Sequence, residues 1–271
     1  MKTLYVLGAA MMTIAALPAA AQDTAPPPPI TVSGSVALVT DYRFRGVSQS
    51  DKEMAIQGGI TVAHESGFYA GVWGSNLAGW GTFGGSNMEL DLIAGYKRAF
   101  GGATVDVGLT WYMYPGGADL TDFAEPYVKV SGTAGPVNLL AGVAYAPKQK
   151  ALGNFSNTPQ SAGQSEDNFY IWGDASAGIP STPITVKAHV GYSDGNPGLG
   201  PNGTSVAPTG KYVDWLLGVD YVLGPVTLGA AYVDTDISKA ESAYLQPNFS
   251  STKDGSSIAD SQIVLSVTAA F

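Results

Sequence analysis

The chain has 271 residues, no cysteine, and 22 acidic against 13 basic residues, a formal net charge of −9. This acidic balance argues against nucleic acid as a partner. The lack of cysteine excludes a small exported domain stapled by disulfides. Charged residues make up only 13%, whereas 35 residues are glycine and 14 are tyrosine. That composition suits a β-barrel with one face in lipid.

The N-terminus has the features of an export signal. Lys2 gives a positive start, residues 4–17 form a short apolar run, and three alanines at 19–21 offer a small-residue cleavage site. The run is shorter than the roughly 20 apolar residues that a membrane-spanning helix needs. We therefore expect a cleaved signal peptide over 1–21, a mature start at Gln22, and a proline-rich periplasmic stub over 22–29.

From residue 30 the sequence alternates between apolar and polar or small residues in short segments, the period of a β-strand. An amphipathic helix would instead show apolar residues at i, i+3, i+4 and i+7. The pattern predicts a transmembrane antiparallel up-and-down β-barrel of about 12 strands over 30–271. The expected strands cover 30–45, 53–63, 68–76, 87–98, 103–114, 123–131, 136–146, 168–178, 183–193, 211–222, 225–235 and 261–271.

Each segment has one apolar and one polar face. In the first segment, Tyr42 and Phe44 continue the apolar face that starts at Ile30, and Asp41, Arg43 and Arg45 fall on the other face. A soluble sandwich or barrel would show the same alternation with its apolar face inward, so the periodicity by itself leaves both architectures open.

The connections favour the membrane barrel. Short joins such as HESG (64–67), GTAG (132–135) and LGP (223–225) alternate with long ones such as 147–167, 194–210 and 236–260. If the N-terminus lies in the periplasm, every short join is periplasmic and every long join is external, as in bacterial outer-membrane barrels. Apolar-face aromatics near segment ends suit the two interfacial girdles of such a barrel: Tyr42, Phe44, Phe68, Tyr96, Tyr145, Phe169, Tyr192, Tyr221 and Tyr232.

The last segment alternates up to a terminal aromatic residue, Phe271. A terminal Phe on such a strand resembles the signal that the barrel-assembly machinery reads. The alternative is an ordinary edge strand that stops at Phe. We expect Phe271 to act as the assembly signal, which makes the assembly machinery and outer-membrane lipid partners of this chain.

The run TDYRFRGVSQSDKEMAIQGGITVAHESGFYAGVWGSN (40–76) carries a family resemblance. It resembles the TorF family of porins, most specifically in TDYRFRGVSQS and SGFYAGVWGSN. The resemblance continues more weakly along strands such as MELDLIAGYKRAF. It implies a small outer-membrane barrel in a Gram-negative bacterium and, more loosely, a pore.

The sequence offers little for catalysis. His64 lies in an expected turn, and His189 faces the expected lumen with Ser176 on the preceding strand. Lipolytic barrels need their nucleophile on the lipid side, and both residues face inward. No metal-ligand spacing of His and Cys occurs, and no glycine-rich stretch precedes a helix as a phosphate-binding loop does. We expect neither an enzyme nor a cofactor.

The remaining signal is a charged lumen with eight acids and five bases. One interpretation is a constriction that selects solutes, and the other is a paired network that fills the barrel. We predict passive diffusion of small hydrophilic solutes with a mild cation preference; the alternative is a structural or surface-interaction barrel with an occluded lumen. No pattern in the sequence indicates an oligomeric state. The expected lumen-lining residues are Asp41, Arg43, Arg45, Glu89, Asp91, Lys97, Asp106, Tyr112, Glu125, Lys129, Asp174, Lys187, His189, Asp214 and Asp220.

Overall fold

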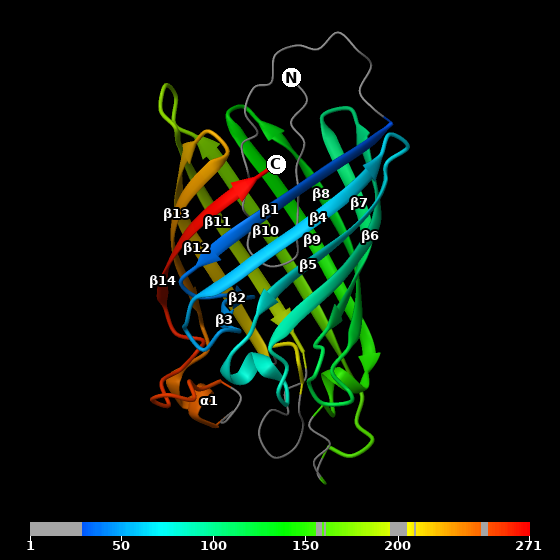
Figure 1. Ribbon diagram of the computed structural model, residues 1–271, viewed down its shortest axis with the longest axis vertical. Coiled ribbons are helices and arrows are strands. Elements are labelled where there is room, and N and C mark those ends of the chain that lie inside the picture. The colour runs from blue at the N-terminus through cyan, green and yellow to red at the C-terminus, as the bar shows by residue number, and fades with distance from the viewer. Residues whose placement is uncertain (1–28, 156–158, 160, 196–204, 209, 245–248) are drawn as a thin grey trace.

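The computed structural model describes residues 29–155, 159, 161–195, 205–208, 210–244 and 249–271. Twelve antiparallel strands close into one barrel, with the strands tilted around it (Figure 1). The predicted twelve-stranded antiparallel barrel is therefore confirmed. The expected signal peptide and most of the proline-rich stub lie outside the described residues.

The barrel strands follow the chain order and each pairs with its sequence neighbours. They are β1 (Ile30–Val39), β4 (Ala55–His64), β5 (Phe68–Asn76), β6 (Met88–Phe100), β7 (Ala103–Met113), β8 (Phe123–Ala134), β9 (Val137–Gln149), β10 (Glu166–Gly178), β11 (Ile184–Asp194), β12 (Lys211–Leu223), β13 (Val226–Thr235) and β14 (Gln262–Ala270). The smaller elements are β2 (Arg43–Phe44), β3 (Val47–Ser48), η1 (Gly79–Thr82), η2 (Lys150–Leu152) and α1 (Lys239–Tyr244).

The barrel closes where β1 meets β14. Only the second half of β1, from Ser35 to Val39, pairs with β14, whereas β1 pairs with β4 along its whole length. Phe271 extends the closure, because its backbone exchanges hydrogen bonds of 2.9 and 3.0 Å with Gly34. The terminal residue therefore takes part in closing the barrel.

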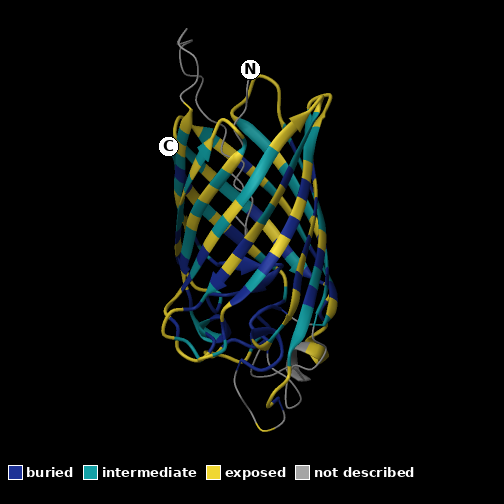
Figure 2. Ribbon diagram, turned by 90° about the vertical axis from the view of Figure 1, so that its right-hand side faces the viewer, coloured by how far each residue is buried: buried dark blue, intermediate teal, exposed yellow. Residues whose placement is uncertain are grey.

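The two faces of the strands differ as the period of two requires. Leu92, Val107, Leu217 and Leu265 are exposed on the outside, while charged side chains on alternate positions are buried inside. Figure 2 shows this alternation as bands of exposed and less exposed residues along the strands. An apolar outer face is what a lipid-embedded barrel presents.

No helix among the described residues is long and apolar enough to cross a bilayer.

The two ends of the barrel differ in their connections. Tight turns join β4 to β5, β6 to β7, β8 to β9 and β12 to β13 at the end where β1 begins and β14 finishes. Gly101, Gly135 and Gly224 in these turns have positive φ, which glycine adopts without steric cost. We call this the turn end. The longer connections lie at the other end, the loop end, where Figure 2 shows the buried residues gathered.

The first expected strand, 30–45, is wrong beyond Val39. The chain leaves the barrel wall there, and β2 and β3 form a small hairpin of their own inside the barrel (Figure 1). We call residues 40–51 the lumen hairpin. Tyr42 and Phe44, which the alternation places towards lipid, are buried in the interior with 0% and 6% of their surface exposed. The interfacial positions expected for these two aromatics are therefore wrong as well.

The physical reason is the turn at Arg45 and Gly46. These two central residues have φ of 50° and 78°, and positive φ at both is the geometry of the two-residue type I′ turn that β-hairpins prefer. The turn reverses the chain within four residues, so alternation cannot continue along the wall. The Arg-Gly pair between Phe44 and Val47 was the signal for this turn.

The connections at the loop end share an aromatic core with the lumen hairpin. Phe83 is central: its ring lies 4.6 Å from that of Tyr114, 5.0 Å from that of Trp80 and 5.5 Å from that of Phe155. We call this cluster the cap. Its buried members are Tyr42, Phe44, Val47, Leu77, Trp80, Phe83, Tyr112, Tyr114, Phe123, Leu152, Phe155, Tyr212, Phe249 and Ile258. The cap covers the lumen at the loop end.

Candidate functional site in the barrel lumen

Arg43 fixes the base of the lumen hairpin. Its Nε donates to Asp41 at 2.6 Å, and its Nη1 donates to the carbonyl oxygens of Gly46, Ile258 and Asp260 at 2.9 to 3.0 Å. Burial raises the pKa of the Asp41 carboxyl, and the Arg43 guanidinium beside it partly offsets this by lowering that pKa. One buried arginine thus connects the hairpin to the β13–β14 connection.

Arg45, in the turn of the lumen hairpin, contacts side chains on β8 and β10. Its Nη2 donates to both carboxylate oxygens of Glu125 on β8 at 2.7 and 2.8 Å. Its guanidinium also lies over the ring of Tyr170 on β10 at 4.2 Å, a cation–π contact. The hairpin starts from β1, and β8 lies five strands away around the barrel. The lumen hairpin and its Arg45–Glu125 ion pair therefore connect β1 to β8 through the lumen.

The tip of the hairpin packs directly on the barrel wall. A Cβ atom on Gly46 would lie 2.4 Å from Cγ2 of Thr235 and 2.9 Å from Cβ of Asp214. The Tyr212 hydroxyl donates to the carbonyl oxygen of Arg45 at 2.9 Å. Only glycine fits between the turn and strands β12 and β13.

Further ion pairs line the wall towards the turn end. Lys129 lies 3.5 Å and Lys97 lies 3.9 Å from the carboxylate of Asp106, and Lys187 lies 2.7 Å from that of Asp220. Lys97 and Lys129 lie directly opposite Asp106 on the neighbouring strands. Lys187 lies opposite Gly218, two residues from Asp220, so its ion pair is diagonal. These lumen charges are arranged to neutralise one another locally.

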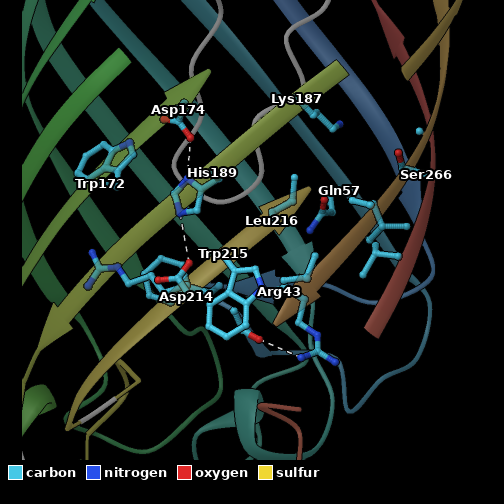
Figure 3. A pocket seen from close by; sticks show the side chains of 18 of the residues that line it. Arg43, Gln57, Trp172, Asp174, Lys187, His189, Asp214, Trp215, Leu216 and Ser266 are labelled. Atoms are coloured by element: carbon cyan, nitrogen blue, oxygen red, sulfur yellow. Dashed lines mark hydrogen bonds and ion pairs between the residues drawn. The ribbon is translucent and has the colours of Figure 1, made fainter. Parts of the chain in front are cut away.

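A chain of hydrogen bonds runs along β10, β11 and β12 on one wall. His189 contacts Asp174 through Nδ1 at 2.6 Å and Asp214 through Nε2 at 3.2 Å, as Figure 3 shows. The Tyr170 hydroxyl lies 2.9 Å from the same Nε2. Because both ring nitrogens face carboxylates, only the doubly protonated imidazole donates to both.

Glu89 and Asp91 stand apart from this pattern. Both lie on the inward face of β6 and both are buried, with 2% and 0% exposed. The Tyr42 hydroxyl donates to Glu89 at 3.0 Å, whereas neither oxygen of Asp91 has a hydrogen-bond partner among the described residues. Neither side chain lines the lumen cavity. These two acids therefore contribute to the cap rather than to the open part of the lumen.

A cavity of about 210 Å³ remains beneath the lumen hairpin. More bases than acids face it: Arg43, Arg45, Lys129, Lys187 and His189 against Glu125, Asp174 and Asp214. Three buried donor atoms from its lining have no hydrogen-bond partner among the described residues, namely Arg43 Nη2, Arg45 Nη1 and Gln57 Nε2. Figure 3 shows several of these side chains around the cavity.

All fifteen residues expected to line the lumen lie inside the barrel, but in three groups. The hairpin group is Asp41, Arg43 and Arg45 with its partners Tyr112 and Glu125; the cap acids are Glu89 and Asp91; the wall network is Lys97, Asp106, Lys129, Asp174, Lys187, His189, Asp214 and Asp220. Sequence reasoning missed Gln57 and Trp73, which also line the cavity. The alternation of β4 and β5 could have placed both on the inward face.

The two histidines differ in setting. His64 contacts Ser66 at 2.8 Å in an exposed turn, and Ser176 has no hydrogen-bond partner among the described residues. Across the described part of the chain, no group of three or more His, Asp and Glu side chains is arranged to bind a metal ion. The charged groups of the lumen are mostly engaged with one another.

Several solved structures are similar to this chain at low sequence identity. A structure described under the in-meso crystallization of membrane proteins has a TM-score of 0.51 and 10% identity, with 89% of this chain and 83% of that chain covered. A refined porin structure has a TM-score of 0.44 and 12% sequence identity, with 89% of this chain and 100% of that chain covered. Salmonella typhi OmpF in complex with daunomycin has a TM-score of 0.43 and 11% sequence identity, with 89% of this chain and 97% of that chain covered. No curated protein matches the chain at a significant level.

The sequence itself matches one protein family over almost its whole length. The match covers residues 23–271 and includes every strand of the barrel. The match does not test the resemblance of the 40–76 run to the TorF family, which stays a prediction. The chain belongs to the family described as a bacterial protein of unknown function (Gcw_chp).

Proposed function

We propose that this chain is a porin-like barrel of the Gram-negative outer membrane, and that the lumen hairpin gates the passive diffusion of small hydrophilic solutes through it. The observation that supports it most is the Arg45–Glu125 ion pair, which attaches the lumen hairpin to β8, five strands from β1 around the barrel. In this proposal the protein performs no catalysis. Its partners are outer-membrane lipid, the barrel-assembly machinery and the diffusing solutes.

The outer face supports the membrane part of the proposal. Large apolar side chains such as Ile56, Leu217 and Ile263 are exposed around the barrel, and burying them in lipid recovers their hydrophobic free energy. Phe68, Tyr145 and Tyr221 are exposed near strand ends, where aromatic side chains meet the lipid headgroups. The apolar run at the N-terminus supports export across the inner membrane.

The polar contacts of the hairpin support a gate. The hairpin leaves the barrel wall after Val39, and its own β-pairing covers only Arg43–Ser48 and Phe44–Val47. A buried ion pair costs desolvation free energy that its attraction only partly returns. A segment attached through such pairs can therefore leave the lumen at a smaller cost than a barrel strand can.

A second candidate is a structural or surface-interaction barrel with a permanently occluded lumen. The aromatic core of the cap favours it, because Phe83 and Phe249 are buried at 1% and 0% exposed and opening would return such side chains to water. The two candidates differ in one measurable property. A gate opens for part of the time, and a permanent cap does not.

We propose that the open barrel, with its hairpin displaced, has a mild preference for cations. With the hairpin displaced, the wall keeps seven acids, of which Glu125 has lost its partner, and three lysines. Acidic rings in a narrow lumen favour cations. With the hairpin in place, Arg43 and Arg45 face the remaining cavity, and this charge argument does not apply.

Single-channel recording in planar bilayers tests the gate. The comparison is between the wild type and a hairpin variant in which residues 41–52 are replaced by Gly-Ser-Gly-Ser. Val39 and Ala55 are paired neighbours, so a short linker joins β1 to β4. We expect brief, infrequent openings in the wild type and long openings in the hairpin variant. Silent folded barrels in both cases would favour the permanently occluded barrel, and steady wild-type conductance would refute the gate.

A further inference from the structure

We propose that the cavity beneath the lumen hairpin binds a small organic carboxylate, held by the spare N–H groups of Arg43 and Arg45 and by the side-chain amide of Gln57. The inference rests on the proposed function only in assuming that solutes reach the lumen. The proposed function specifies only small hydrophilic solutes. This inference adds a chemical class of ligand and a binding site for it in the lumen.

The unused donors carry the inference. Arg43, Arg45 and Gln57 are 3%, 9% and 5% exposed, and each has a buried nitrogen without a partner among the described residues. Buried donors in folded proteins are nearly always satisfied, and an unsatisfied one is costly. All three side chains line the same cavity. Three such donors at one cavity indicate an acceptor that enters from outside the chain.

The other hydrogen bonds of the two arginines show why the spare nitrogens remain. Arg43 uses Nε and Nη1 on Asp41 and on backbone carbonyls, and Arg45 uses Nη2 on Glu125. A guanidinium presents its donors in a rigid planar fork. The contacts that anchor the hairpin therefore leave one nitrogen of each arginine for another acceptor.

The charge of the cavity selects an anion. Five lining residues are basic, counting His189, and three are acidic. Lys129 and Lys187 each have a carboxylate partner on the wall, so the unengaged positive donors are those of the hairpin. Guanidinium groups bind carboxylates through charge-assisted hydrogen bonds, which are about twice as strong as neutral ones. A cation or an uncharged solute would leave this advantage unused.

The volume and walls of the cavity limit the rest of the ligand. About 210 Å³ is below the roughly 300–1,000 Å³ typical of drug-sized ligand sites, so only a small molecule fits. Trp73, Tyr170 and Trp172 contribute aromatic surface to the lining. A carboxylate on a short apolar chain suits both parts of the site, with its charge at the hairpin and its carbons against the rings.

Calorimetric titration of the folded barrel in detergent micelles tests the site with three probes of matched size: butyrate, butyramide and n-butylammonium. Micelles without protein provide the blank for each probe. We expect saturable one-to-one binding of butyrate and none of the other two at the same millimolar concentrations. Absence of saturable butyrate binding, or equal binding of butyramide or butylammonium, would overturn the proposal.

Variants at Gln57 test the assignment of the donors. Gln57→Leu removes one hydrogen bond to a charged ligand, so butyrate should bind roughly 10- to 100-fold more weakly. Gln57→Glu places a like charge at the ligand and should abolish butyrate binding. Thr268→Val is the matched control, because the buried Thr268 hydroxyl has no hydrogen-bond partner in the described part of the chain and Thr268 does not line the cavity. Folding of every variant is checked by heat-modifiable gel migration.

The outcomes separate this site from the gate. Wild-type butyrate affinity in Gln57→Leu would refute the assignment of donors, whatever the barrel conducts. Butyrate binding in a barrel that never conducts would support the site while refuting diffusion through the lumen. Gated conductance without butyrate binding would refute the site alone.

Discussion

Gly46 combines the two demands that the lumen hairpin makes on its turn. Its φ of 78° lies in the left-handed region, where a residue with a Cβ costs roughly 1–2 kcal/mol. Its close approach to Thr235 and Asp214 leaves no space for a side chain. The turn therefore depends on this glycine both for its backbone conformation and for its packing on β12 and β13.

Gly46→Ala should displace the hairpin and raise the open probability of the channel in planar bilayers. Gly101→Ala is the control, since Gly101 also has positive φ, 60°, but a Cβ there would meet nothing within 4 Å. Both substitutions place an alanine at a positive φ, which destabilises the turn. Only the new Cβ of Gly46→Ala would also overlap atoms of the barrel wall. Equal open probabilities in the two variants would show that hairpin packing does not control the lumen.

Leu92 and Asp91 are neighbours on β6 that face opposite sides of the barrel wall. Leu92→Arg should cost roughly 2–4 kcal/mol, as expected for a cation facing lipid at mid-membrane. Asp91→Asn should be tolerated, because it removes an uncompensated buried charge and breaks no hydrogen bond with a described residue. Urea titration of heat-modifiable folded protein measures both. Greater damage from Asp91→Asn would mean that the apolar face is not the lipid face.

The strands of the barrel illustrate what the sequence can predict. Alternation places Leu92 outward and Asp91 inward, because a strand has a fixed period of two. It fails at Tyr42 and Phe44, because the same period continues to residue 45 although the strand leaves the wall after Val39. Local alternation is identical in a wall strand and in an inward hairpin, and only the positive φ at Arg45 and Gly46 separates them.

The candidate site was predictable in part for a related reason. The inward faces of β10, β11 and β12 identify Asp174, His189 and Asp214. Asp174 lies directly opposite His189, and Asp214 lies diagonal to it, opposite Gly191. The Arg45–Glu125 pair was not predictable, because it joins β8 to a hairpin that has left the barrel wall and lies in the lumen. Pairwise partners across a barrel depend on its closure and size, which periodicity does not specify.

The terminal strand β14 closes the barrel over a short pairing with β1, and Phe271 extends it. A Cβ on Gly34 would lie 2.6 Å from Cζ of Phe271, so the terminal ring covers this glycine. Deleting Phe271, or Phe271→Asp, should reduce the amount of folded barrel in the outer membrane. The reason is twofold, since the variant loses both the expected assembly signal and a contact at the closure.

Heat-modifiable gel migration of outer-membrane fractions measures this effect. Phe271→Tyr is the control, because it keeps an aromatic terminus. To separate assembly from stability, the same variants are refolded in detergent without the assembly machinery. Normal levels of folded Phe271→Asp in cells would refute the signal, and a defect equally large in detergent would assign the role to closure alone.

At the scale of the whole molecule, the loop end and the turn end should face different compartments. Protease added to intact cells should cut within 147–167, 194–210 or 236–260, whose described residues lie at the loop end. The two turns that contain Gly67 and Gly135 should be cut only after the outer membrane is permeabilised. Cleavage at either turn in intact cells would reverse the orientation of the barrel.

Ion selectivity connects the lumen charges to the proposed function. The lumen with its hairpin has eight acids and five bases, and removing the hairpin takes away Asp41, Arg43 and Arg45. Seven acids and three lysines then remain, so the negative surplus rises from three to four where His189 is neutral, or from two to three where His189 is charged. The hairpin variant also frees Glu125 from its ion pair, which places an unpaired carboxylate in the opened passage.

Reversal potentials of the hairpin variant in a salt gradient should therefore show cation preference. The preference should fall as salt rises, because the screening length shortens from about 10 Å at 0.1 M to about 3 Å at 1 M. Adding Glu125→Gln to the hairpin variant should weaken the preference, since it removes the carboxylate that the hairpin had paired. Adding Asp194→Asn is the control, because Asp194 is paired with Lys211 at an exposed position near the end of β11. Anion preference in the hairpin variant, or an equal effect of both substitutions, would refute control of selectivity by the lumen wall.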